Sequence, residues 1–401
     1  MARIIGIRHR VKKTADGEAR PTMVAIKDGV KVTPYTLETE TDELDFVLGR
    51  FPTSYRELGE GENVGSFLPH HVQRQKKRGS TEEIIRVPAS YDGLRERDVV
   101  AMALGGSGDR LAYALSRRGD DIGAKVMRIP PFTLKEWRKE SSKDNDHLML
   151  IELAEAGPEL FQATGPRDRD LIHLQEAFRA RRDAMKDRIA CEQRLRQQVI
   201  GCIFLSEDGH YPEGLIEDEY DRQKASDVIL QALVKEEDQR ESELKRAVRS
   251  LEIWQKLFAH IEGCGEVIAA GIVSSIGDIR RFATAAKLKA YCGVHVLTDG
   301  RLPRKRGGEV ANWNSVARQS LFLLGDQFNY RPDSEWGKKF RQYKANMREQ
   351  HPEVVEEGGK KRFTDGHLHK RARWRALTRF VEMLFREWTR IEAERVEKAA
   401  A

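Results

Sequence analysis

The stretch from Ile261 to Val294 constrains the fold of this chain more than any other part. It holds Gly263-Cys264-Gly265 between an amphipathic helix and an Ala-rich apolar segment, and a second expected helix, 283–291, ends in Cys292-Gly293. Glycines permit a tight turn and let the backbone approach a ligand closely, while the N–H groups at the start of the next helix point outward. The pattern predicts a helix-hairpin-helix whose Gly263 and Gly265 meet a nucleic-acid phosphate.

Composition narrows the possible functions only modestly. The chain has 401 residues, enough for two or three domains, and Lys+Arg exceed Asp+Glu by 70 to 64, giving a net charge of +6. This excess is compatible with nucleic-acid binding without requiring it. The four cysteines form no CxxC pair and no apolar run approaches a membrane span, so we expect a cytoplasmic protein with reduced thiols and no membrane partner. No Cys/His cluster has ligand spacing, which argues against zinc.

Residues 1–160 alternate strand and helix signals and predict an α/β layer fold with a mixed sheet. A Gly-, Arg- and Lys-rich segment, 52–82, shows no periodicity and is expected to be a loop or insertion of unassigned role. The expected strands are 3–7, 22–27, 30–35, 99–104 and 125–129, and a helix is expected over 146–156.

Residues 161–260 form a second expected domain, a highly charged helical stretch broken around Asp208-Gly209. One apolar stripe precedes the break and another follows it, which indicates two long antiparallel helices in a coiled-coil stalk. A plain helical spacer, without a role of its own, is the favoured interpretation of the stalk itself. One face is rich in arginine and suits either a phosphate backbone or solvent: Arg179, Arg181, Arg182, Arg188, Arg194 and Arg196.

Residues 261–401 are the third expected domain, mainly helical, with a last long helix over 370–396. Between its helices lies a basic, Gly-rich segment, 298–308, that suits phosphate. The nucleic-acid-binding candidates in this segment are Arg301, Arg304, Lys305 and Arg306.

An α/β domain, a coiled coil and a helix-hairpin-helix with a Gly-rich basic loop follow one another in this order. The chain resembles the DEDD insertion-sequence transposases, the group that includes the bridge-RNA-guided recombinases and the pilin-gene invertases. The resemblance is strongest in the C-terminal third and covers the whole architecture in outline. The motifs that carry it are Glu262-Gly-Cys-Gly265, Arg281-Phe282 through Leu288, Tyr291 and Gly293, Asp299-Gly300, and Val316-Ala-Arg318 with Leu321.

The resemblance implies a RuvC-like domain of the RNase H fold, in which four acids hold two divalent cations such as Mg²⁺. Three of the four expected acid positions hold Arg8, Ala103 and Lys143, and only Asp146 is acidic. Two positive charges disfavour metal binding, so Asp146 is a metal ligand only if a site persists. In one interpretation, Asp109 and Asp144, which lie near the positions that lack an acid, partly replace the missing carboxylates. In another, Asp146 is simply the N-cap of its helix.

A second centre implied by the resemblance is a C-terminal serine that attacks the DNA phosphate. Its position holds Asp299, and the neighbouring Thr298 retains a hydroxyl. A threonine attacks only when a base or metal activates it. Asp146, Thr298 and Asp299 are therefore the catalytic candidates.

Three hypotheses follow. The favoured one is a catalytically degenerate relative that binds DNA and a structured, guide-like RNA without cutting, because basic residues at former acid positions remove repulsion toward phosphate. The second is an active RNA-guided transposase or recombinase with a Mg²⁺ site and a hydroxyl nucleophile. The third is an oligomeric scaffold. Since family members act as multimers, the resemblance implies a homo-oligomer, a dimer or a tetramer.

Overall fold

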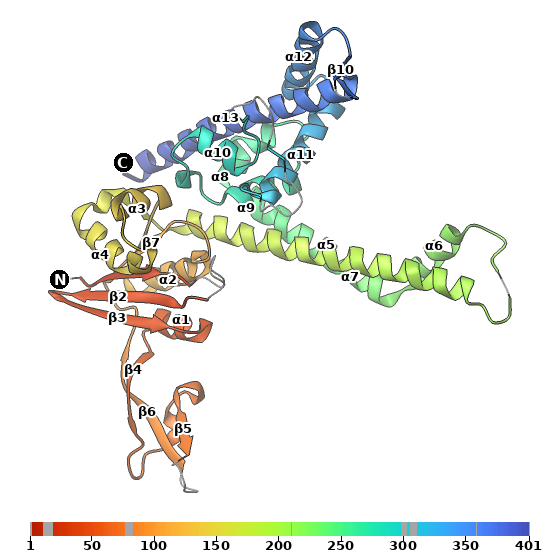
Figure 1. Cartoon of the computed structure of the whole chain (residues 1–401). Coiled ribbons are helices and arrows are strands. Elements are labelled where there is room, and N and C mark those ends of the chain that lie inside the picture. The colour runs from red at the N-terminus through yellow and green to blue at the C-terminus, as the bar shows by residue number, and fades with distance from the viewer. Residues whose placement is uncertain are drawn as a thin grey trace. The chain divides into compact units, whose positions relative to one another are not determined.

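The computed structural model describes residues 2–10, 19–76, 83–209, 211–297, 303–304, 311–357 and 359–400 (Figure 1). The chain divides into two compact units, Met1–Arg169 and Asp170–Ala401. In the described part of the chain, no helix combines the length and the apolar character needed to cross a membrane.

The first unit is built on a six-stranded mixed sheet of order β3-β2-β1-β7-β8-β9 (Figure 1). β1 is parallel to β7, and β7 is parallel to β8, whereas β2, β3 and β9 each run antiparallel to their neighbours. The five strands expected from the sequence are present, with ends within two residues of the prediction. The strands are β1 (Ile4–Arg8), β2 (Thr22–Asp28), β3 (Lys31–Leu37), β7 (Val99–Ala103), β8 (Lys125–Ile129) and β9 (Gln162–Ala163).

Helices cover both faces of this sheet, so successive residues of β1 face two different cores. Ile5 and Ile7 pack in the core that includes residues of α1 (Glu40–Val47) and α2 (Asp109–Ile122), whereas Ile4 packs in the core that includes α4 (Asp146–Ala156). The described part of the unit also contains α3 (Pro131–Arg138), η3 (Lys143–Asn145) and η4 (Pro158–Leu160). The prediction of a helix over 146–156 is confirmed.

Gly6 sets how closely α4 approaches the sheet. A Cβ atom at this position would lie 1.9 Å from the carbonyl oxygen of His147, in the first turn of α4. No side chain fits there, so glycine is the residue that allows α4 to lie against β1.

A separate three-stranded antiparallel sheet, of order β4-β6-β5, includes parts of the region expected to be a loop or insertion (Figure 1). It consists of β4 (Phe51–Glu57), β5 (Gln73–Lys76) and β6 (Glu83–Asp92), with the short helices η1 (Val64–Ser66) and η2 (Pro69–His71) between β4 and β5. The prediction of a loop is wrong for residues 52–57 and 73–76, which are strands. Few residues of this sheet are buried, so its sequence lacks the alternation that marks a half-buried strand.

In the second unit, α5 (Pro166–Phe204), whose first residues belong to the first unit, lies beside α7 (Val228–Arg249) (Figure 1). The two helices are antiparallel: Arg181 and Arg188 of α5 bind Glu241 and Glu237 of α7 at 3.0 and 2.5 Å. The short α6 (Ile216–Ser226) follows the expected break. Four arginines of the Arg-rich face of α5 are engaged by glutamates: Arg179, Arg181, Arg188 and Arg196.

The remainder of the unit is helical around one apolar core, and the helices expected over 283–291 and 370–396 are both present. A single short hairpin, β10 (Val355–Glu357) and β11 (Lys360–Arg362), interrupts the described helices. Phe380, Leu384 and Trp388 of the last helix are fully buried. The helices are α8 (Glu252–Lys256), η5 (Phe258–His260), α9 (Glu266–Ile276), η6 (Ile279–Arg281), α10 (Ala285–Tyr291), α11 (Ser315–Tyr330), α12 (Glu335–Gln350) and α13 (Asp365–Ala400).

Candidate nucleic-acid interface and metal cluster

The structure gathers most of the expected acid positions at one edge of the six-stranded sheet. β1 and β7 are parallel neighbours, so Arg8 and Ala103, at their carboxyl ends, come to the same edge. Lys143 lies in η3, and Asp146 is the first residue of α4, which packs on β1.

Arg8 is a partly desolvated cation at this edge. Its Nη2 donates to the carbonyl of Pro21 at 3.3 Å, while its Nε is buried and has no hydrogen-bond partner among the described residues. Burial lowers the pKa of Arg8 below its ordinary value, and the charge of Asp144 opposes that shift. The Arg8 side chain therefore places a cation where the resemblance implies an acid.

Asp146 is held by a bidentate ion pair. Arg138 donates from Nε to Oδ1 at 2.7 Å and from Nη2 to Oδ2 at 2.8 Å. The N-cap of α4 is Asn145, and Asp146 follows it, so the interpretation of Asp146 as an N-cap is wrong. Its charge still lies at the positive end of the helix dipole. Arg138 thus neutralises the charge of Asp146 and uses one acceptor site on each oxygen, which weakens its attraction for a cation.

The two acids expected to compensate also have basic partners. Asp109 accepts from Arg128 at 2.7 Å, and Asp144 accepts from Arg20 at 2.5 Å. A hydrogen bond from Ser142, then the charges of Arg20 and Arg8, lower the pKa of Asp144. Asp109, Asp144 and Asp146 are therefore each paired with an arginine, which opposes cation binding at the site that the resemblance implies.

Glu43 of α1 anchors the residues that follow Arg8. It accepts from Thr22 Oγ1 at 2.6 Å and from Arg10 Nε at 3.0 Å, and lies 3.3 Å from His9 Nε2. Burial alone would raise its pKa, but hydrogen bonds from His9, Arg10 and Thr22 lower the pKa to about 2. This edge thus carries a stable carboxylate that is already saturated with donors.

The Gly263-Cys264-Gly265 turn has the tight geometry expected from the sequence. Gly263 has φ +87°, and a Cβ atom there would lie 2.8 Å from Cβ of Gln327. Gly265 is the N-cap of α9 and has open space around it. Cys264 is buried, and burial raises its pKa to about 12. The turn thus presents Gly265, rather than Gly263, to an incoming ligand.

Charged side chains flank this turn. Glu266, in the first turn of α9, accepts from Arg249 Nε at 2.9 Å, and Arg331 lies within 3.3 Å of the position of a Cβ on Gly263. The acid already interacts with the backbone N–H of the helix start. A phosphate at Gly265 would meet both this carboxylate and the flanking arginines.

Most of the basic loop, including Thr298, Asp299, Arg301, Lys305 and Arg306, lies outside the described residues. Within it Arg304 is exposed and Pro303 is buried.

Arg318 of α11 anchors the described part of that loop, a role that the motif did not reveal. Its Nη2 donates to the carbonyl of Pro303 at 2.9 Å. Its guanidinium carbon lies 4.6 Å from the ring centroid of Trp313 and 4.8 Å from that of Trp374. These contacts desolvate the cation, and burial lowers its pKa.

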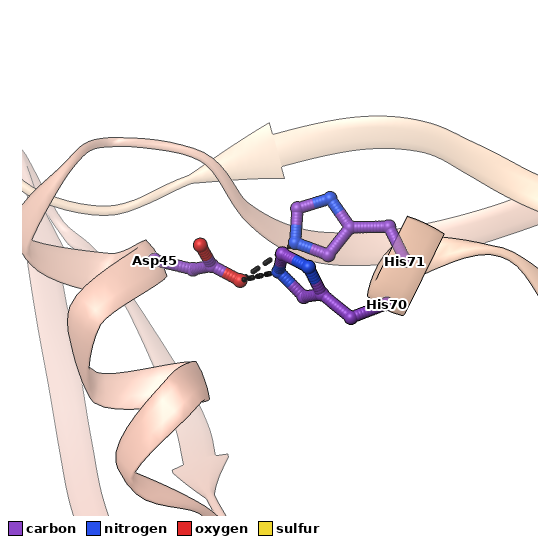
Figure 2. A group of neighbouring side chains, drawn as sticks. All are labelled: Asp45, His70 and His71. Atoms are coloured by element: carbon purple, nitrogen blue, oxygen red, sulfur yellow. Dashed lines mark hydrogen bonds and ion pairs between the residues drawn. The ribbon is translucent and has the colours of Figure 1, made fainter. Parts of the chain in front are cut away.

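A cluster of three possible metal ligands, which the sequence did not predict, consists of Asp45 on α1 and of His70 and His71 on η2 (Figure 2). Nε2 of His70 lies 2.8 Å, and Nε2 of His71 2.6 Å, from the same Oδ2 of Asp45. Asp45 and His71 are buried, while the His70 side chain is 42% exposed. Adjacent histidines 25 residues from their carboxylate have no recognisable ligand spacing, so the pattern alone gave no signal.

The helical segment around the Gly263 turn is similar to a transposase family. Residues 255–300 match the model of the Transposase IS116/IS110/IS902 family, in agreement with the resemblance seen in the sequence. The match includes the turn, α9 and α10 and reaches the expected nucleophile positions Thr298 and Asp299. Curated proteins provide no match to the chain.

Proposed function

We propose that this protein is a transposase- or recombinase-type protein that binds DNA and a structured RNA and has lost the metal-dependent cutting chemistry. One observation carries the proposal: Asp146, the single remaining acid of the expected four, is bound on both oxygens by Arg138. The other three positions hold Arg8, Ala103 and Lys143. Two Mg²⁺ ions need several carboxylate ligands, and one acid in four expected positions, itself paired with Arg138, favours the loss of that site.

The elements around the expected acid positions support a RuvC-like domain in this proposal. Gly6 still allows α4 to lie on β1, and β1 and β7 are parallel neighbours, as a RuvC-like RNase H fold with acids on β1, β7 and α4 requires. We assign residues 1–160 to that fold, 161–260 to a coiled-coil stalk and 261–401 to the transposase-type helical domain.

The same edge is suited to binding phosphate. The Arg8 side chain is only partly buried, and Arg20 and Lys143 add positive charge nearby. Replacing acids by bases converts a surface that repels phosphate without metal into one that attracts it, with release of counterions. The hairpin with Gly263 and Gly265, together with the loop basic residues at 301 and 304–306, is the second contact region in this proposal. We propose that the protein acts in the cytoplasm as a dimer or tetramer.

Arg8 provides the most specific test. In electrophoretic mobility shifts of the full-length protein with duplex DNA and with structured RNA, R8Q should weaken binding and reduce the slope of log K against log salt by about 0.9 for DNA. R117Q is the matched control, because Arg117 is an exposed arginine of α2 paired with Asp121. Equal affinities and slopes for R8Q, R117Q and the unmodified protein would contradict a role of this edge in binding.

The active-enzyme hypothesis and the scaffold hypothesis predict other outcomes of these assays. An active enzyme converts supercoiled DNA to cut or joined products with Mg²⁺ or Mn²⁺, and D146A or T298A abolishes the product. A scaffold shows neither product nor salt-dependent shift.

A further inference from the structure

We propose that Asp45, His70 and His71 form a binding site for a divalent transition metal, with Zn²⁺ the best fit. One possible ligand atom from each residue lies within 4.8 Å of those of the other two. The cluster shares no residue with the edge that carries Arg8 and Asp146, and the inference goes beyond the proposed function.

The ligand types select the metal. Two imidazoles and one carboxylate suit Zn²⁺ and neighbouring transition metals, whereas Mg²⁺ and Ca²⁺ prefer oxygen ligands alone. Three protein ligands leave a fourth tetrahedral position for water. The side chain of His70 is 42% exposed, so solvent reaches this side of the cluster, while Asp45 and His71 close the other side at 2% and 3%.

The geometry needs only a small adjustment. Nε2 of His70 and of His71 lie 2.8 and 2.6 Å from Oδ2 of Asp45, at hydrogen-bond distance (Figure 2). Zinc–ligand bonds of about 2.0–2.1 Å in a tetrahedron put ligand atoms roughly 3.3 Å apart. An outward shift of about half an ångström in each histidine therefore makes room for the ion.

Neighbouring groups prepare the ligands. Arg50 Nε donates to the other oxygen, Oδ1 of Asp45, at 2.8 Å, which orients the carboxylate with Oδ2 toward the histidines. Nδ1 of His71 is buried and has no hydrogen-bond partner in the described part of the chain. Nε2 of His71 binds an ion only when it is deprotonated, and the neutral ring then carries its proton on Nδ1, where no described acceptor compensates for burial. The metal bond must therefore outweigh one unsatisfied buried donor.

A bound ion would link two elements of the first unit. Asp45 is on α1, which packs against α2 and β3, and the histidines form η2, in the connection between β4 and β5. The metal would hold the connection between β4 and β5 against α1. Because ion binding favours the folded state only, it should raise the thermal stability of the unit.

The test uses the full-length protein, freed of metal by chelation and titrated with Zn²⁺ and, as a spectroscopic probe, Co²⁺. We expect one equivalent of Zn²⁺, a visible Co²⁺ absorption of the intense tetrahedral type, and a rise in melting temperature with Zn²⁺. H70A and D45N should lose all three effects. H173A is the matched control, since His173 is an exposed histidine of α5, and it should bind as the unmodified protein does.

His70 is half exposed, so H70A should keep the fold, which circular dichroism checks; H70Q is a second variant of closer size. Absence of stoichiometric binding to the unmodified protein would overturn the proposal, as would equal binding by H70A or H70Q. If H173A loses binding to the same extent as H70A, the metal binds scattered surface histidines, and the proposal is also overturned.

Discussion

Replacing Gly6 with alanine tests the packing that holds the proposed interface together. The new Cβ would lie 1.9 Å from the His147 carbonyl oxygen, where ordinary contacts begin at 3.4 Å. The carbonyl is backbone and the Cβ is fixed to backbone, so α4 and β1 must separate by about 1.5 Å. That separation loosens Leu150 and Leu153, which are 1% and 0% exposed. Overpacking of this kind costs about 3 kcal/mol, the upper end of its usual range.

Hydrogen exchange measured by mass spectrometry resolves this effect by segment. A loss of about 3 kcal/mol corresponds to exchange roughly 100-fold faster in peptides of β1 and α4. Peptides of α13, in the second unit, provide an internal reference. G165A is the control in the first unit, because a Cβ on Gly165 meets no atom within 4 Å. Unchanged exchange in G6A would refute the close packing of α4 on β1 and the placement of Asp146 that depends on it.

Three further predictions concern other parts of the molecule. The pKa of Glu43 is about 2 in the folded protein, below its ordinary value of 4.5, so the ionised carboxylate stabilises the fold by about 3 kcal/mol above pH 4.5. This contribution is lost as the pH falls toward 2. E43Q should therefore be less stable than the unmodified protein at neutral pH, and its stability in urea unfolding should depend less on pH in the acid range. Iodoacetamide at neutral pH should label the exposed Cys202 and spare Cys264, whose pKa is about 12, and labelling of Cys264 in the folded protein would contradict its burial. R318A should lower the free energy of unfolding of the second unit by about 2 kcal/mol, because the aromatic contacts and the hydrogen bond to Pro303 are lost, and R318K should lower it by less. Urea unfolding followed by Trp fluorescence measures this change. Equal stability of both variants and the unmodified protein would contradict the anchoring role of Arg318.

The central sheet could be predicted from the sequence because its strands carry strong apolar signals. β1 and β7 are short apolar strands whose middle residues are buried, and α4 begins at the expected residue. The three-stranded sheet could not be predicted, since β4 and β6 expose much of both faces and show neither a period of two nor an apolar run. Its turns also lack the short Asn-Gly or Asp-Gly pattern of a tight hairpin.

The residues of the candidate sites likewise include some that could be predicted from the sequence and some that could not. The sequence places Arg8, Ala103 and Lys143 by their position relative to strands and helices, which needs only local patterns. The pairing of Asp146 with Arg138 depends on how α3 and α4 pack, and the convergence of two histidines on Asp45 depends on a loop returning to α1. Such contacts between separate elements leave no periodic trace in a single sequence.

The proposed loss of cutting chemistry is tested most directly by incubating the full-length protein with DNA under conditions where mobility shifts show binding. Denaturing gels with Mg²⁺, Mn²⁺ or chelator then report whether any phosphodiester bond is cut or joined. We expect salt-sensitive binding that does not depend on metal, and DNA strands that stay intact in every lane. Metal-dependent products that disappear in D146A or T298A would contradict the account and establish an active recombinase.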